Sequence, residues 1–195
     1  VINDTTWQFK LKRNVKFHNG EPFDAAAVKF SIERMLNPKQ GAPGRTSIAT
    51  IDHVDVVDAY TANVITKAPF PLLGVRMSPG HCGTVGIVPP KYLAQVGDAG
   101  FAVKPVGTGP YKFVEWVKDE RLVLEANKDY HRGAPAIERL IFRPVPELTT
   151  RVAALVSGQA DLVSDIPPDQ TGKIQSSGTA HVEISSLGGF VIMVK

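Results

Sequence analysis

The chain has 195 residues, of which 43% are apolar and 21% charged, and its formal net charge is +3. A chain of this length and composition buries a core in one or two globular domains, so wholesale disorder is not expected. Its 22 lysines and arginines are scattered among 19 acids without a basic run, which argues against nucleic-acid binding.

A single cysteine, Cys82, rules out an internal disulfide but leaves the cellular compartment open. No apolar stretch approaches the roughly 20 residues that span a bilayer. No signal peptide precedes the first predicted strand, and the last residues have the pattern of a strand interior. We therefore expect both ends of the chain to be cut rather than native.

The chain opens with a predicted half-buried antiparallel strand, because Trp7, Phe9 and Leu11 alternate with polar residues. Asp24 fits the N-cap of a helix that Asn37-Pro38 ends. Helices then alternate irregularly with hairpins, which predicts a mixed α/β or α+β class. Before the glycine loop, the further expected elements are strands within 51–57 and 62–66, an apolar turn or helix at 72–77, and a strand at 85–88. A helix from Pro90 to Val96, closed by Gly97, and a loop-like stretch at 97–107 follow. After that loop we expect a hairpin with arms at 111–117 and 122–126, a strand at 139–145, a helix at 149–157 with Gly158 after it, a strand at 161–164, a helix from Pro168 to about 176, and strands at 181–187 and 190–194.

The most informative segment is Gly107-Thr108-Gly109-Pro110-Tyr111. A phosphate-binding glycine loop needs a strand before it, a helix after it and a Lys-Ser/Thr pair at its end. Here a strand follows instead, since Tyr111, Phe113 and Val117 are apolar and Lys112 is polar. We therefore interpret the segment as a tight turn into a sheet, with the glycines in structural roles.

No catalytic or metal-binding arrangement stands out. His81-Cys82 places a base beside a nucleophile, but neighbouring side chains usually point apart and no third orienting group is evident. Cys82 is better explained as a loop or core residue. The remaining histidines do not stand at metal-ligand spacing, and hydrolase motifs and a Walker lysine are missing. We predict no catalytic residue, no metal, no cofactor, and a protein that is not an enzyme.

Several segments, in order, resemble the family 5 solute-binding proteins of bacterial ABC importers, which bind peptides, nickel complexes and related solutes. The strongest match is Pro105–Tyr111. Three residues depart from the family's usual ones: Ala27, where Asp is frequent, His131, where Trp is common, and Asn19, where Asp is common in the turn. The other matching segments are Trp7–Lys12, Phe17-His18-Asn19-Gly20-Glu21-Pro22-Phe23, Ser31–Arg34, Glu125–Gly133, Arg143–Pro146 leading into Thr150-Arg151, and Leu155–Leu162.

The resemblance implies one lobe of a periplasmic-binding-protein-like type II fold, with mixed sheets and flanking helices. Residues 1–102 correspond to the small variable domain of the first lobe, and residues 103–195 to part of its main body. The second lobe has no counterpart here. Because family members trap solute between two closing lobes, we expect the isolated chain to fold but to bind solute poorly.

Two loops of the small domain face the solute cleft in the family. Arg45 of the first loop offers a planar guanidinium to a solute carboxylate, although a solvated loop arginine is the plainer interpretation. The second loop offers backbone amides at close approach. Phe190 lies where the chain leads toward the hinge. The candidate ligand-binding residues are therefore Arg45, Thr46, Gly80, His81, Cys82, Gly83 and Phe190.

The implied function is that of the substrate-binding component of an ABC importer for peptides or other small polar solutes. Such a protein works in the periplasm, or lipid-anchored outside the cell, and delivers solute to permease subunits in the inner membrane. The alternative is a stand-alone lobe that acts as a protein-interaction module, because fold does not fix function. In that case the edge of the last predicted strand would pair with another chain, including a second copy.

Overall fold

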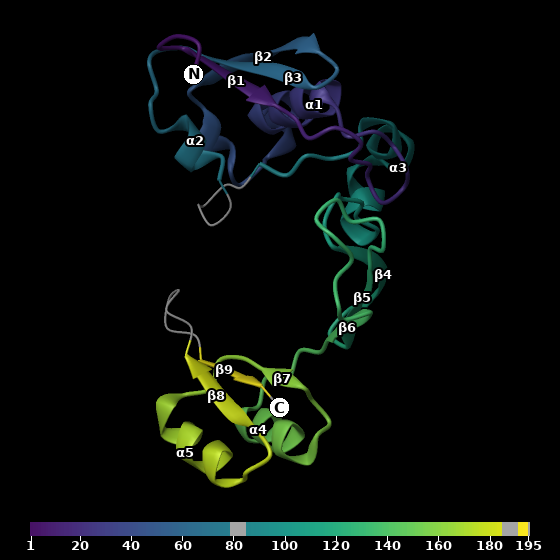
Figure 1. Ribbon diagram of the computed structural model, residues 1–195, viewed down its shortest axis with the longest axis vertical. Helices are drawn as coiled ribbons and strands as arrows, with labels where there is room; N and C mark the ends of the chain where they lie inside the picture. The colour runs from purple at the N-terminus through teal and green to yellow at the C-terminus, as the bar shows by residue number, and fades with distance from the viewer. Residues whose placement is uncertain (79–84, 185–190, 195) are drawn as a thin grey trace. The chain divides into compact units, whose positions relative to one another are not determined.

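The computed structural model describes residues 1–78, 85–184 and 191–194 (Figure 1). The chain divides into two compact units. The first consists of Val1–Val117 with Leu122–Ile141, and the second of Lys118–Arg121 with Phe142–Lys195. Both contain helices and three-stranded sheets, which confirms the predicted mixed α/β class. The assignment of residues 1–102 and 103–195 to two parts of a lobe stays a prediction.

The first unit begins with an antiparallel sheet of three strands in the order β1-β3-β2. In its register Trp7 lies opposite Val64, and Val64 lies opposite Val54, so apolar side chains of all three strands share one face. This confirms the alternation seen in the sequence. The strands are β1 (Thr6–Lys10), β2 (Ile51–Asp58) and β3 (Thr61–Thr66).

Helix α1 (Ala25–Leu36) covers the apolar face of this sheet. The side chain of Asp24 accepts a hydrogen bond of 2.9 Å from the amide of Ala27, which satisfies one free amide of the first turn. Asn37 is extended, as a residue before proline tends to be, and ends the helix. Both predicted helix boundaries are confirmed.

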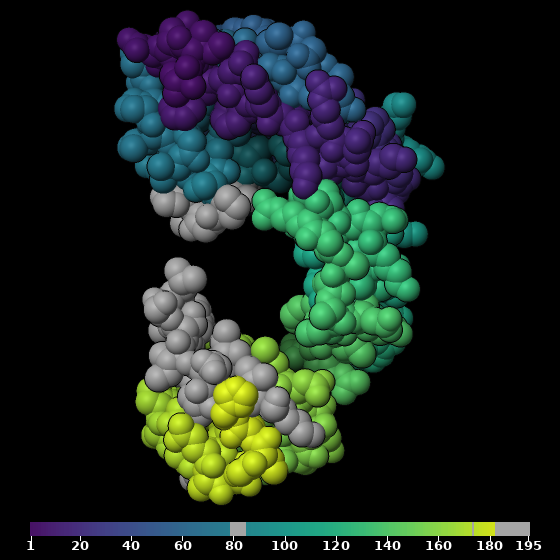
Figure 2. All heavy atoms as spheres, viewed as in Figure 1, coloured from purple at the N-terminus to yellow at the C-terminus, as the bar shows by residue number. Residues whose placement is uncertain are grey.

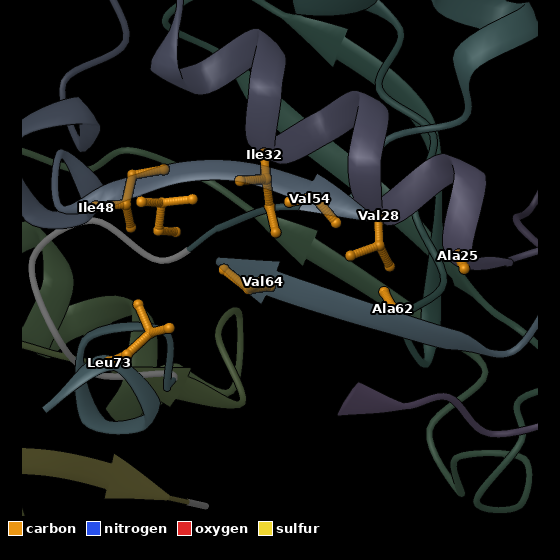
Figure 3. Close-up of a cluster of buried hydrophobic side chains, with 9 residues drawn as sticks. Ala25, Val28, Ile32, Ile48, Val54, Ala62, Val64 and Leu73 are labelled. Carbon is orange, nitrogen blue, oxygen red and sulfur yellow. The ribbon is translucent and has the colours of Figure 1, made fainter. Parts of the chain in front are cut away.

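The core of the first unit lies between α1, β2 and β3 and extends to two short helical segments (Figure 3). These are η2 (Arg45–Ile48) and α2 (Leu73–Arg76), and a further turn, η1 (Pro38–Gln40), follows α1. Side chains from elements far apart in sequence thus exclude water together, which is the main stabilisation available to a unit of this size. The buried cluster contains Ala25, Val28, Ile32, Ile48, Ile51, Val54, Ala62, Val64 and Leu73.

Two predictions for the stretch before the next sheet are wrong. Residues 85–88 form no strand, because the amide of Val88 donates to the hydroxyl of Ser31 at 3.0 Å while Val85 and Ile87 pack on the core. The loop expected over 97–107 is the second. In α3 (Pro90–Val103), Gly97 has φ 69° and ψ 176° and ends the first helical segment, as predicted, but a second helical segment follows this kink and continues to Val103.

A second sheet in the order β4-β5-β6 follows. Its strands are β4 (Tyr111–Val117), β5 (Arg121–Ala126) and β6 (Arg139–Phe142). The predicted hairpin is confirmed, with Asp119 in the left-handed region at its turn. Strand β6 is shorter than predicted, and Pro144, which lies beyond its end, has no amide hydrogen to extend a ladder.

The second unit packs two helices on a small antiparallel sheet ordered β7-β9-β8. Gly158 adopts the left-handed conformation after α4, as its position in the sequence predicts. Leu155, Val163, Ile166 and Ile174 form the buried cluster. The predicted extensions of the last two strands into 185–190 lie outside the described residues. The elements are α4 (Leu148–Ser157), β7 (Leu162–Val163), α5 (Pro168–Ser176), β8 (His181–Ile184) and β9 (Val191–Val194).

Candidate functional site

Arg45 and Thr46, the two predicted ligand-binding residues that the structure describes, open the short helix η2. Thr46 is exposed and Arg45 is half-buried. The Nε of Arg45 donates a hydrogen bond of 2.8 Å to the carbonyl oxygen of Leu36, the last residue of α1. This bond holds the root of the guanidinium, and the described residues supply no hydrogen-bond partner for its two outer nitrogens.

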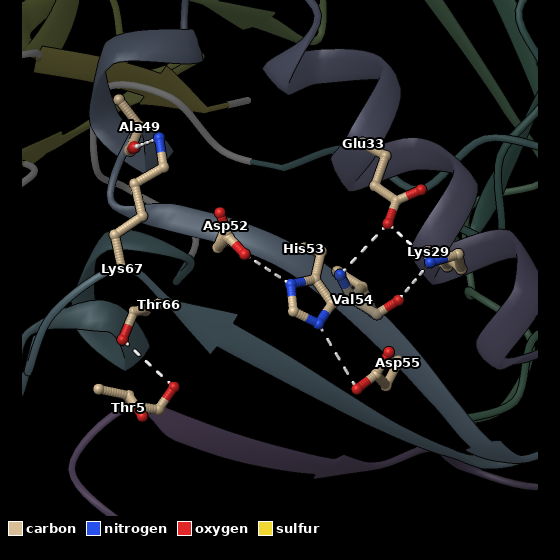
Figure 4. Close-up of polar contacts among 10 residues, drawn as sticks. All are labelled: Thr5, Lys29, Glu33, Ala49, Asp52, His53, Val54, Asp55, Thr66 and Lys67. Carbon is tan, nitrogen blue, oxygen red and sulfur yellow. Dashed lines mark hydrogen bonds and ion pairs between the residues drawn. The ribbon is translucent and has the colours of Figure 1, made fainter.

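Buried Ile48 anchors η2 in the core. Lys67, just after β3, donates from its backbone amide to the carbonyl of Thr50 at 2.9 Å and from Nζ to the carbonyl of Ala49 at 3.2 Å (Figure 4). A second cation is therefore attached beside the segment that carries Arg45. The hydroxyl of Thr50 is buried without a hydrogen-bond partner.

The other predicted ligand-binding residues, Gly80, His81, Cys82, Gly83 and Phe190, lie outside the described residues. The structure therefore brings together only Arg45 and Thr46 of the seven candidates, and the rest stay predictions. Sequence reasoning did not point to Lys67. This residue follows no motif, and its proximity to η2 arises from the return of β3 past the end of β2.

The edge of β2 carries a polar network that serves structure (Figure 4). Lys29 of α1 donates to Glu33 and to the carbonyl oxygen of Val54, and the same Glu33 oxygen accepts from the amide of Val54 at 3.3 Å. Helix α1 is thereby tied to the edge strand, where backbone groups otherwise meet only solvent.

On the same strand, the exposed His53 bonds to Asp52 at 2.8 Å and approaches Asp55 at 3.6 Å. The hydrogen bond with Asp52 and the nearby Asp55 charge raise the pKa of His53 above its usual value. No three His, Cys, Asp or Glu side chains gather into a metal site anywhere in the described part of the chain.

Three of the motif segments meet at the glycine loop before β4. The carbonyl oxygen of Gly109 lies 3.0 Å from His18 Nε2 and 3.1 Å from Asn127 Nδ2. His18 comes from the first motif and Asn127 from the turn after β5. The loop leads directly into β4 at Tyr111, as predicted, and its glycine carbonyls accept protein hydrogen bonds.

A shallow cavity of about 300 Å³ opens on the sheet β4-β5-β6. Its charged lining balances two acids against two cations, so the local charge favours neither anionic nor cationic ligands. The sequence offers no motif that would have revealed it. Its lining residues are Val114, Glu125, Ala126, Lys128, Glu138 and Arg139.

Known proteins resemble this chain along nearly its whole length. The glutathione-binding protein GsiB of Pectobacterium atrosepticum is 34% identical over 174 residues, which cover 88% of this chain and 33% of that protein. The solute-binding protein MoaA of A. tumefaciens R10, solved with mannopinic acid, matches with a TM-score of 0.85 at 27% identity and covers 94% of this chain and 37% of its own. AgaA from the same source, solved with agropinic acid, matches with a TM-score of 0.82 at 28% identity. This match covers 93% of this chain and 36% of AgaA.

The chain thus spans about one third of the length of the relatives that it matches. These likenesses confirm the predicted periplasmic-binding-protein type II fold. No helix among the described residues is both long enough and apolar enough to cross a bilayer. The model of the bacterial extracellular solute-binding proteins, family 5 Middle, matches residues 2–194, and the chain belongs to that family of solute-binding proteins.

Proposed function

We propose that this chain forms part of the substrate-binding component of an ABC importer for peptides or similar small polar solutes. The observation that carries the proposal is the family match over residues 2–194. One relative of this chain is named for glutathione, which is a tripeptide, and two others were solved with mannopinic acid and agropinic acid. All of these solutes are small and polar and carry carboxylates.

In this proposal the protein works outside the inner membrane, in the periplasm or on a lipid anchor. It binds solute reversibly, closes around it and delivers it to permease subunits, with no covalent chemistry. Residues 1–102 act as the small domain of the first lobe and residues 103–195 as part of its body. Closure against a second lobe would supply the remaining contacts.

The proposed solute contacts are the loop that carries Arg45 and Thr46, the loop Gly80–Gly83, and Phe190. Arg45 is suited to a carboxylate because its Nε is already held by Leu36 at 2.8 Å. A guanidinium fixed at its root loses less side-chain freedom when its outer edge binds a ligand. Lys67, held beside η2 by Ala49, adds positive charge there.

The test is a ligand screen on the protein as its gene encodes it. Thermal unfolding is followed with dipeptides, longer peptides, glutathione, mannopinic acid, agropinic acid and a nickel–histidine complex. A ligand at 100 times its Kd stabilises the folded state by about 2.7 kcal/mol, which raises the Tm measurably. A specific rise with one peptide or opine class supports the proposal. No rise with any of them, together with no small molecule found by native mass spectrometry, would contradict it.

Arg45→Ala tests the site. Loss of a carboxylate contact should weaken binding of the identified solute by about tenfold or more. Arg143→Ala removes the same charge from an exposed position after β6 and should leave the Kd unchanged. Equal Kd values in wild type and both variants would remove Arg45 from the solute site and leave the family function intact.

A further inference from the structure

Residues 16–22 form a small hairpin, closed by a bridge between Lys16 and Pro22. The amide of Phe17 donates to the carbonyl of Glu21 at 2.8 Å, and the amide of Gly20 donates back to Phe17 at 2.8 Å. Asn19 adds a bond from its side chain to the Glu21 carboxylate at 2.7 Å. The 16–22 hairpin is therefore a stiff unit, and it holds two side chains that reach distant parts of the chain.

The first contact is made by Glu21 at the start of α3. Its carboxylate accepts hydrogen bonds from the backbone amides of Lys91 at 3.1 Å and Tyr92 at 2.8 Å. The N-cap residue of this helix is Pro89, whose side chain has no acceptor. Glu21 thus satisfies amides that the helix leaves free, and its negative charge faces the positive end of the helix dipole.

The second contact is made by His18 beyond the other end of α3. Its backbone amide donates to the carbonyl of Gly107 at 2.8 Å. Its Nε2 lies 3.0 Å from the carbonyl oxygen of Gly109, and the amide of Gly107 points to its Nδ1 at 3.4 Å. A carbonyl only accepts and an amide only donates. Both ring contacts are therefore made together only by the neutral ring with its proton on Nε2.

Asn127 holds the same loop from the side of β5. Its Nδ2 donates to the carbonyl of Gly109 at 3.1 Å, and its backbone amide donates to Pro110 at 2.7 Å. The residue is only 5% exposed. One carbonyl oxygen, that of Gly109, is therefore shared by a side chain from the 16–22 hairpin and one from the turn after β5.

We propose that the 16–22 hairpin is a strap that fixes both ends of the α3 segment, residues 89–109, so that the β1-β3-β2 sheet and the β4-β5-β6 sheet move as one body. Early residues, in purple, abut green residues of the turn after β5 in the space-filling view (Figure 2), where Lys12 donates to the carbonyl of His131. The consequence is that no hinge lies in this long connection. Any bending that accompanies solute capture occurs elsewhere, and this holds whatever the solute is.

The test is amide hydrogen exchange on the protein as its gene encodes it, with residue resolution by NMR. Glu21→Gln weakens the first contact, and we expect exchange of the Lys91 and Tyr92 amides to rise about tenfold. His18→Leu removes both ring contacts, and exchange of the Gly107 amide should rise similarly. Glu147→Gln is the matched control, because Glu147 sits at the N-cap of α4 without a side-chain bond. Glu147→Gln should change neither the exchange of the Lys91 and Tyr92 amides nor that of the Gly107 amide.

Crosswise effects decide whether the hairpin acts as a strap. Glu21→Gln should also raise exchange at Gly107, and His18→Leu at Tyr92, because both contacts belong to one stiff hairpin. His18→Gln, which restores a donor toward Gly109, should recover part of the protection and serves as the readout if His18→Leu does not fold. Changes confined to each variant's own site would overturn the proposal. So would a ring nitrogen spectrum that shows the neutral ring of His18 with its proton on Nδ1, because that tautomer has no donor for the Gly109 carbonyl.

Discussion

Arg45 donates from Nε to the carbonyl oxygen of Leu36 at 2.8 Å and so completes the end of α1. The last carbonyls of a helix have no partner within it, and a cation there also interacts favourably with the helix dipole. The residue proposed to bind solute therefore has a structural role as well. Its two roles use different edges of the guanidinium, and variants can separate them.

Arg45→Ala should lower the free energy of unfolding by about 1–2 kcal/mol, because a charge-assisted hydrogen bond at the helix end is lost. Arg45→Lys keeps the charge but not the planar Nε donor, so it should lower the free energy of unfolding by less than Arg45→Ala does. Urea denaturation measures both. An unchanged midpoint in Arg45→Ala would mean that the bond to Leu36 contributes nothing in solution.

Ile32 has no exposed surface and lies on the sheet-facing side of α1. Ile32→Ala removes buried methyl groups and leaves a cavity, so we expect a loss of about 2–5 kcal/mol in unfolding free energy. Val57→Ala, at a side chain that is 54% exposed, is the control and should stay within about 0.5 kcal/mol of wild type. Similar losses in the two variants would contradict the assignment of the core to this face of α1.

Gly100 lies just after the kink in α3 and has no room for a side chain. A Cβ built there would stand 2.8 Å from the Cβ of Val96. Gly100→Ala should therefore destabilise the protein by about 1–3 kcal/mol, as overpacking does. Gly86→Ala makes the same change where no atom lies within 4 Å, and its effect should be near zero. A neutral Gly100→Ala would contradict the close approach of Val96 to Gly100.

His131 should make the protein less stable in acid. Burial lowers the pKa of His131 below its ordinary value of 6.5, and the charges of Lys12 and Arg132 add to this. The unfolded state then binds the proton more tightly, so stability is full above about pH 6.5 and is lost as the pH falls through the lowered value. Its Nδ1 is also buried without a partner.

His131→Phe should flatten this acid loss, since it keeps a ring beside Tyr130 and removes the titrating group. Unfolding free energies from pH 8 to pH 5 measure the effect. A variant with the same slope as wild type would show that His131 does not titrate differently in the folded state.

His53 should affect the pH dependence of stability in the direction opposite to His131. Its pKa is raised by the hydrogen bond with Asp52 and by the charge of Asp55. Its contribution is fully present below pH 6.5 and is lost as the pH rises through the raised value. His53→Gln should therefore cost stability at pH 5 and none at pH 9. The pair is exposed, so the effect should be small, and a cost that is larger at pH 9 would contradict the assignment.

The sequence predicted the parts of the fold that depend on neighbours along the chain. The alternation of Trp7 and Phe9, the cap at Asp24 and the stop at Asn37-Pro38 each have a local physical cause, and the structure confirms them. The strand predicted at 85–88 is wrong because its apolar residues pack on a core without pairing to another strand, and the amide of Val88 donates to Ser31. For Gly97, the sequence indicated a break in the helix but not its continuation beyond the break.

By itself the sequence determined the class of fold, most of the strands and helices, and the family. These depend on the order of motifs and on periodicity among residues that are close together in the sequence. Only the tertiary structure decided which distant groups meet. Gly109 receives bonds from His18 and Asn127, and Arg45 is held by Leu36. Contacts of this kind depend on how strands pair and helices pack, and neither is fixed by the spacing of residues along the chain.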